Sequence, residues 1–103
     1  MKVVICYGSP EWDISGLAIR QYCEMKGLTD EKSDERLRME DSLLSGEIPR
    51  HDPTLVKIVE SLGKGSGRLQ VRNIKGIRYI IEQDEDGWEY ILEPQDIEWI
   101  TGI

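Results

Sequence analysis

The sequence predicts an α+β protein in which a small antiparallel β-meander packs against two or three helices. An amphipathic helix with clear start and stop signals lies near the middle of the chain, at 49–63. Short runs that alternate apolar and polar residues follow it, separated by turn residues, as is typical of antiparallel strands. A β-branched run near the N-terminus predicts one more strand, which can join the same sheet.

The chain has 103 residues and is expected to form a single domain over 1–103. Its composition, 39% hydrophobic and 32% charged, is that of a globular protein with its own core. No apolar stretch approaches the ~20 residues of a membrane span, and the short N-terminal apolar run does not predict a signal peptide. We therefore expect a cytoplasmic protein with reduced thiols at Cys6 and Cys23.

The N-terminal part predicts a strand followed by a helix. Consecutive β-branched residues predict a buried strand over 2–7, and turn residues predict a loop over 8–13. A helix is expected over 15–27, with a start at Ser9 as the alternative. Its expected apolar face consists of Ile14, Leu17, Ala18, Tyr22 and Met25, with Cys23 beside it.

The charged stretch 29–46 has two interpretations. Its Glu and Arg residues are good helix formers, which favours a partly exposed helix from about Ser33 to Leu44. Its few apolar anchors also fit a mobile excursion. The sequence alone leaves both open.

The central helix has the clearest local signals. Asp52 is a good N-cap residue, and Pro53 suits the first helical position, where no N–H is missed. Gly63 is expected to end the helix in a left-handed conformation. The expected apolar face consists of Leu55, Val56, Ile58, Val59 and Leu62.

The last third predicts the strands of the meander. A flexible connector is expected over 64–68, and Asp84–Gly87 has the composition of a hairpin loop. The expected strands are 69–72, 77–82, 88–93 and a short edge strand at 97–100. In the hairpin, the face with Ile77, Tyr79 and Ile81 is expected to pair with the face that carries Trp88, Tyr90 and Leu92.

Some of these residues resemble a group of small phage- and prophage-encoded proteins of unassigned function. The pattern comprises an N-terminal strand ending in Cys6-Tyr7-Gly8, the run Pro-Arg-His-Asp-Pro at 49–53 with its helix, and the acidic hairpin at 80–90. The chain departs from that pattern after Gly8 and at its C-terminus. The resemblance implies a phage setting, and it implies no reaction and no site.

The net charge of −7 narrows the choice of partners. Nucleic acid calls for clustered Lys and Arg, so a direct nucleic-acid partner is not expected. A basic protein of a bacterial host suits an acidic chain, whereas the alternative is that acidity only keeps a small protein soluble. The edge strand expected near the C-terminus leaves homodimerisation open.

Two features are candidates for contact with a protein partner. Asp84, Glu85 and Asp86 form an acidic hairpin tip that lacks the spacing of a calcium loop, and a solvated turn is the alternative. Trp12 lies in a predicted loop and is a candidate hot spot, because exposed Trp residues concentrate binding energy. The alternative for Trp12 is that it caps the core.

A third feature is a candidate anion site. Lys64 and Arg68 flank a Gly-rich segment, and Arg50 and Arg72 would add positive charge. A phosphate loop normally precedes a helix, whereas this segment follows one, so a plain connector is the favoured alternative.

No residue predicts catalysis. His51 is the sole histidine, has no nucleophile nearby in the sequence, and is expected to pack at the helix entry. Cys6 lacks the Cys–Arg spacing of thiol phosphatases and is expected to be buried. One His and two distant Cys do not make a zinc site, so no metal or cofactor is expected.

Two functions from different classes follow. The first is a non-enzymatic, phage-encoded interaction protein that inhibits a host defence factor, in the manner of an anti-CRISPR, through its acidic surface. The second is a small-molecule or nucleotide-signal binding protein that uses Lys64 and Arg68.

Overall fold

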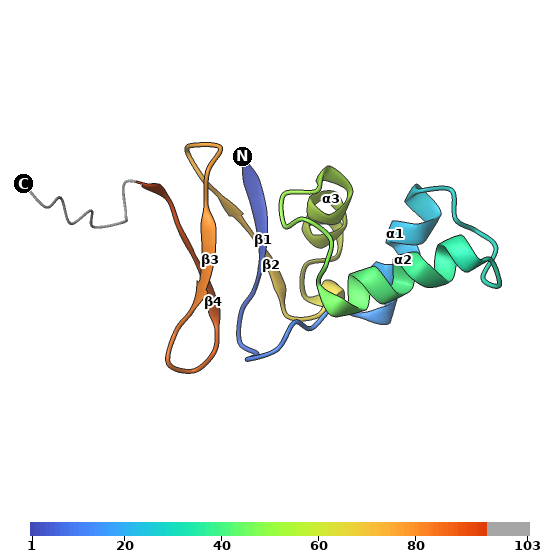
Figure 1. Ribbon diagram of the computed structural model, residues 1–103, viewed down its shortest axis with the longest axis horizontal. Coiled ribbons are helices and arrows are strands. Elements are labelled where there is room, and N and C mark those ends of the chain that lie inside the picture. Colours follow the sequence, from blue (N-terminus) through green and yellow to red (C-terminus); the bar gives the residue numbers. More distant parts are fainter. Residues whose placement is uncertain (95–103) are drawn as a thin grey trace, which may run out of the picture.

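A computed structural model describes residues 1–94 of the chain and confirms the α+β class (Figure 1). The helices are α1 (Gly16–Met25), α2 (Asp34–Ser45), α3 (Pro53–Leu62) and the 3₁₀-helix η1 (Gly63–Ser66). The strands are β1 (Lys2–Cys6), β2 (Leu69–Asn73), β3 (Ile80–Gln83) and β4 (Glu89–Leu92). The edge strand expected at 97–100 lies outside the described residues.

The described strands form two separate antiparallel sheets of two strands each, so the prediction of one continuous meander is wrong. β2 pairs with β1, with Lys2 opposite Asn73 and Cys6 opposite Leu69. β3 pairs with β4. The reason is burial: β1 is buried along most of its length, and β2 supplies its hydrogen-bonding partner, whereas β3 is largely exposed.

The helices all lie on one side of the β1–β2 sheet, and the β3–β4 hairpin lies on the other (Figure 1). α3 packs on both β1 and β2, α1 packs on α3, and α2 packs on α1. We expected α3 to cover the strands of the final third, and this is right for β2 but wrong for the hairpin, which contacts β1 through β4. The core therefore sits between the β1–β2 sheet and the helices.

Helix α1 begins as predicted but buries a different face. Ser15 is the N-cap, and its hydroxyl accepts the Ala18 N–H at 3.1 Å. Leu17 and Met25, expected in the core, are 43% and 49% exposed, while Ile19 is buried. Two neighbouring stripes of α1 are apolar, and its contacts with α2 and α3 decide which one faces inward.

The charged middle stretch is helical, which confirms the first interpretation and excludes the mobile excursion. Ser33 caps α2 by accepting the Arg36 N–H at 3.2 Å, and Gly46 ends it in the left-handed region. Arg36 is buried and donates to the Leu28 carbonyl at 3.1 Å and to Glu40 at 3.0 Å. This buried guanidinium, with its two acceptors, joins the polar helix α2 to the segment that follows α1.

Helix α3 has the predicted boundaries. The Asp52 carboxylate accepts the Leu55 N–H at 3.0 Å and the Tyr22 hydroxyl at 3.1 Å. Gly63 has a positive φ of 53° and begins η1. The four residues that α3 buries are Leu55, Val56, Ile58 and Val59.

The connector after α3 is ordered, so the prediction of a flexible segment is wrong. Ser66 is fully buried, and its carbonyl accepts the Ser15 N–H at 2.8 Å. Gly67 has a φ of 107°, and a Cβ there would lie 2.4 Å from the Asp13 carbonyl oxygen. The glycine allows the chain to pass close to the loop before α1, which locks the connector in place.

The hairpin forms where predicted, but its register differs. Asp84 donates its N–H to the Trp88 carbonyl at 2.9 Å, and Gly87 has a φ of 84°. The pairing puts Ile80 opposite Leu92 and Glu82 opposite Tyr90. Ile81 lies opposite Ile91, and Ile77 and Tyr79 precede β3, so the predicted pairing of Ile77, Tyr79 and Ile81 with Trp88, Tyr90 and Leu92 is wrong. The hydrogen bond across the loop sets this register.

Candidate functional site

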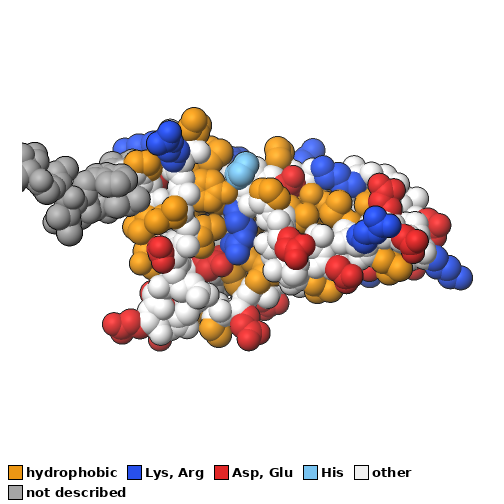
Figure 2. Space-filling model, in the orientation of Figure 1, with side chains coloured by type: hydrophobic (Ala, Val, Ile, Leu, Met, Phe, Trp, Pro, Cys, Tyr) orange, Lys and Arg blue, Asp and Glu red, His pale blue; other side chains and the backbone are white. Residues whose placement is uncertain are grey.

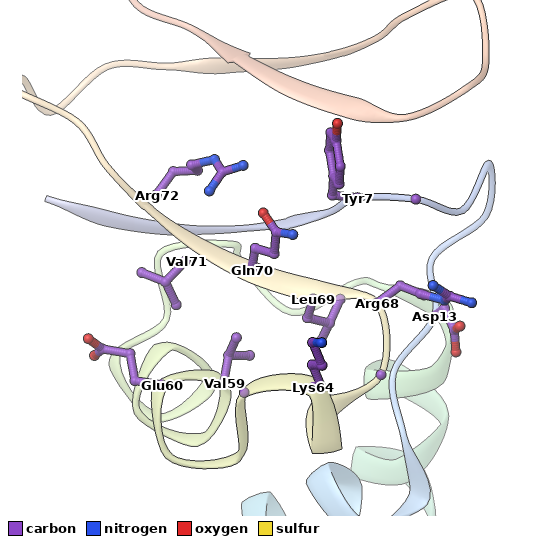
Figure 3. Close-up of a pocket in the computed structure, with 13 residues that line it drawn as sticks. Tyr7, Asp13, Val59, Glu60, Lys64, Arg68, Leu69, Gln70, Val71 and Arg72 are labelled. Atoms are coloured by element: carbon purple, nitrogen blue, oxygen red, sulfur yellow. The ribbon is translucent and has the colours of Figure 1, made fainter.

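A cleft of about 810 Å³ lies beside β2, where the strand passes α3 and η1 (Figure 3). Lys64 and Arg68, predicted as an anion site, both line it, and Arg72 joins them from the far end of β2. The structure thus brings together three of the four cations singled out in the sequence. Arg50, the fourth, does not line this cleft.

Side chains from both faces of β2 line this cleft. Leu69 and Val71 point toward α3, where Val59 also contributes, whereas Gln70 and Arg72 point to the other side with Tyr7 (Figure 3). Successive side chains of a strand alternate between faces, so only a cleft that straddles the strand edge meets both sets. Sequence reasoning missed Tyr7, Val59 and Gln70, because their convergence depends on the pairing of β1 with β2.

The cleft has an excess of positive charge. Besides the three cations, Asp13 and Glu60 line it. The Glu60 carboxylate lies 2.7 Å from the Lys2 ammonium, which offsets its charge. In a chain with a net charge of −7, this is a locally basic surface.

Arg50 instead joins the hairpin to β1. Its Nη2 donates to Glu89 Oε2 at 2.9 Å, and Nη1 pairs with the other carboxylate oxygen. Its guanidinium stacks on the Trp12 ring, 4.2 Å from the centroid. The Glu89 carboxylate also accepts the Cys6 N–H at 2.7 Å. Although burial acts to raise the pKa of Glu89, the bonds from Arg50 and Cys6 lower it below its ordinary value.

Trp12 is half-buried below this ion pair. Its indole N–H donates to the Leu43 carbonyl at 2.7 Å, and its ring packs against the core and Gly46. This placement favours the core-capping alternative over a partner contact.

In the acidic hairpin tip, one carboxylate stabilises the turn and the other two residues are exposed. Asp84 accepts the N–H groups of Asp86 and Trp88, both at 2.9 Å, so its carboxylate holds the turn. Glu85 and Asp86 are exposed. Figure 2 shows acidic side chains at this lower end of the hairpin.

His51 lies at a different cleft, of about 500 Å³, next to the hairpin. Its Nδ1 is 2.7 Å from the Tyr79 hydroxyl. Ile77, Ile80, Leu92 and Pro94 give it an apolar lining, to which Arg78 adds one cation. Cys6 is not part of it. The cleft therefore does not join the histidine to a thiol.

Both cysteines are free and buried. Burial raises the pKa of the Cys6 thiol and of the Cys23 thiol, which disfavours the reactive thiolate. Within residues 1–94, no group of three or more His, Cys, Asp or Glu side chains is arranged to hold a metal ion. No helix in this range combines the length and apolar character needed to cross a membrane.

Comparison of the chain with protein families, curated proteins and solved structures finds no match in any of the three.

Proposed function

We propose that this chain is a non-enzymatic interaction protein whose acidic surface binds a basic surface of a bacterial host protein. The hairpin tip carries the proposal, because Glu85 and Asp86 are exposed there and no cation of the described residues pairs with them. An unpaired acidic projection steers the approach to a basic partner. The motif resemblance to phage proteins supports a host protein as that partner.

Inhibition of a host defence factor is the role we propose for this binding. A groove that holds nucleic acid carries clustered Lys and Arg, and acidic side chains compete with phosphates for those cations. Stable protein interfaces bury roughly 800 Å² on each partner. A chain of 103 residues is large enough to cover such a groove with one face.

Pull-down from a bacterial lysate tests the proposal with a charge-reversed tip. We expect the wild-type chain to retain a stoichiometric basic partner and Glu85→Lys/Asp86→Lys to lose it. Glu24→Lys/Glu47→Lys makes the same charge change at exposed positions elsewhere and should retain the partner. Retention should also weaken as salt is raised.

A plating assay supplies the functional readout. Expression of the wild-type chain should restore phage plating on a strain that carries the targeted defence system, and the tip variant should not. The proposal fails if no stoichiometric partner is captured and plating is not restored on any strain of a panel with diverse defences.

A second function is favoured by the convergence of Lys64 and Arg68 on one cleft. A nucleotide or cyclic nucleotide would place its phosphates between these cations. A thermal-shift screen separates the two functions, since a ligand at about 100 times its Kd adds about 2.7 kcal/mol to folding stability. A rise in Tm of several degrees that Lys64→Ala/Arg68→Ala abolishes supports this second function, and no shift with any nucleotide excludes it.

A further inference from the structure

The outer edge of β2 has backbone groups that no described strand pairs. Val71 lies opposite Val4, and the Val4 N–H points away from β2, toward the Arg50 carbonyl at 2.7 Å. In an antiparallel pair, two opposite residues either exchange hydrogen bonds or both point away from each other. The N–H and C=O of Val71 therefore point to the outer edge, and the same register turns those of Leu69 and Asn73 outward.

The other edge of the same sheet is closed. The outward N–H of Val4 bonds to Arg50, and the outward N–H of Cys6 bonds to the Glu89 carboxylate at 2.7 Å. Side chains and backbone of distant segments thus cover β1, whereas among residues 1–94 β2 pairs with β1 alone. An uncovered strand edge is a template for pairing with another chain.

The cleft beside this edge has room and lining for an added strand. It measures about 810 Å³ and runs along β2 from Leu69 to Arg72. On the α3 side it offers apolar contacts from Val59, Leu69 and Val71 (Figure 3). On the opposite side it presents Gln70 and Arg72. A strand laid here would place alternate side chains on these two unlike surfaces.

The positive charge of the cleft favours an added strand that carries acidic side chains. Lys64, Arg68 and Arg72 surround the edge, and Lys2 offsets the charge of Glu60. Carboxylates at alternate positions of an added strand would face Arg72, while apolar residues between them would face α3. A second copy of this chain fits poorly, because pairing two β2 edges would bring the cations of both copies to one seam.

We infer that the outer edge of β2 is a further binding surface, which takes an extended acidic segment of a partner protein as an added β-strand. This mode of recognition draws affinity from main-chain hydrogen bonds and specificity from the alternate side chains. The surface shares no residue with the acidic hairpin tip, so its test does not depend on the partner of the tip.

A labelled synthetic peptide in which Val and Glu alternate tests the inference by fluorescence anisotropy with the full chain. We expect saturable binding that weakens as salt is raised. Arg72→Glu should weaken the affinity by about tenfold or more, which corresponds to about 1.4 kcal/mol. Arg38→Glu makes the same charge change at an exposed position of α2 and should bind as the wild type does. Circular dichroism checks that both variants are folded.

Backbone N-methylation separates strand addition from simple charge attraction. One peptide is methylated at its Val residues and another at its Glu residues. Only one of the two sets of amides faces β2 in either strand orientation, so one methylated peptide should bind like the parent and the other should not.

Three results would overturn the inference. They are equal affinities of the two methylated peptides, unchanged binding to the Arg72→Glu variant, and equal binding of a peptide with Lys in place of Glu. Displacement of the peptide by millimolar ATP, together with equal affinities of the methylated peptides, would assign the cleft to small anions instead.

Discussion

Arg50 joins parts of the chain that are far apart in the sequence. Its backbone carbonyl accepts the Val4 N–H, its guanidinium covers the Trp12 ring, and it pairs with Glu89 of β4. The Arg50 and Glu89 side chains are only 17% and 11% exposed. At this depth, removing one charge of the pair destabilises the fold, because the remaining charge is poorly solvated and has no counter-ion.

We therefore expect Arg50→Met to lower the free energy of unfolding by about 3 kcal/mol, since it leaves the Glu89 carboxylate without its cation. Arg50→Met/Glu89→Gln should recover part of this loss. Lys2→Met, which breaks an ion pair with side chains 47% and 43% exposed, should cost less than ~1 kcal/mol. Urea unfolding measures all three, and equal losses in the two single variants would contradict the expectation.

The pKa of Glu89 predicts a dependence of stability on pH. The bonds from Arg50 and Cys6, working against burial, hold this pKa below its ordinary value of 4.5. The stability from this shift is fully present above that value and is lost as the pH falls through the lower, folded pKa. The stability difference between the wild type and Glu89→Gln should therefore stay constant above pH 4.5 and shrink as the pH falls below it. Urea unfolding above and below that pH checks it, and a difference that stays constant below it would contradict it.

At the scale of elements, η1 holds the start of α1 against the end of α3. Ser15 illustrates this, because its hydroxyl caps α1 and also donates to the Gly65 carbonyl at 2.6 Å. Gly67 continues the contact through an isolated β-bridge with Ile14. The same segment carries Lys64 into the cleft and leads into Arg68, so its order positions two of the three cations.

The two glycines at either side of this contact should respond oppositely to alanine. Gly67→Ala should cost about 2 kcal/mol or more, because φ is 107° and the new Cβ would lie 2.4 Å from the Asp13 carbonyl oxygen. Gly16→Ala meets nothing within 4 Å and should raise helix stability by about 0.5 kcal/mol. Thermal or urea unfolding measures both, and a neutral Gly67→Ala would mean that the connector moves freely.

At the scale of the whole molecule, the β3–β4 hairpin is the layer with the fewest buried contacts to the rest of the described chain. It packs on the face of the β1–β2 sheet opposite the helices (Figure 1). Its contacts include the Arg50–Glu89 pair, a contact of the Trp88 ring with Tyr7, and a bond from the Gln83 side chain to the Pro10 carbonyl at 3.1 Å. Ile80 and Tyr90 remain 45% and 41% exposed. Few buried contacts mean a low free energy of local opening.

Amide hydrogen exchange should reveal this difference between layers. We expect amides of β3 and β4 to exchange through a lower-energy opening than those of β1 and α3. Arg50→Met should accelerate exchange in the hairpin more than in α3, because it removes the anchor of that layer. Uniform protection across both layers, or equal acceleration in both, would contradict this organisation.

Elements that depend on near neighbours in the chain could be predicted from the amino-acid sequence. Asp52 was predicted as a cap, helix starts were predicted near Ser15 and Ser33, and a hairpin loop was predicted at Asp84–Gly87. These features are local, because a cap or a tight turn is satisfied within a few residues. Lys64 and Arg68, singled out in the sequence as two nearby cations, both line the cleft beside β2. Trp12 could not be placed, because its exposure depends on Arg50 and Leu43, which are distant in the chain.

The pairing of the strands, in contrast, is set by contacts between segments that are distant in the chain. β1 precedes the helices in the sequence, and β2 follows them. Their pairing leaves one edge of β2 beside the three cations, and no strand among residues 1–94 pairs with that edge. In the folded chain, Arg50 lies outside that cleft and pairs with Glu89. Such choices rest on burial and hydrogen bonding between distant segments, which local sequence patterns do not encode.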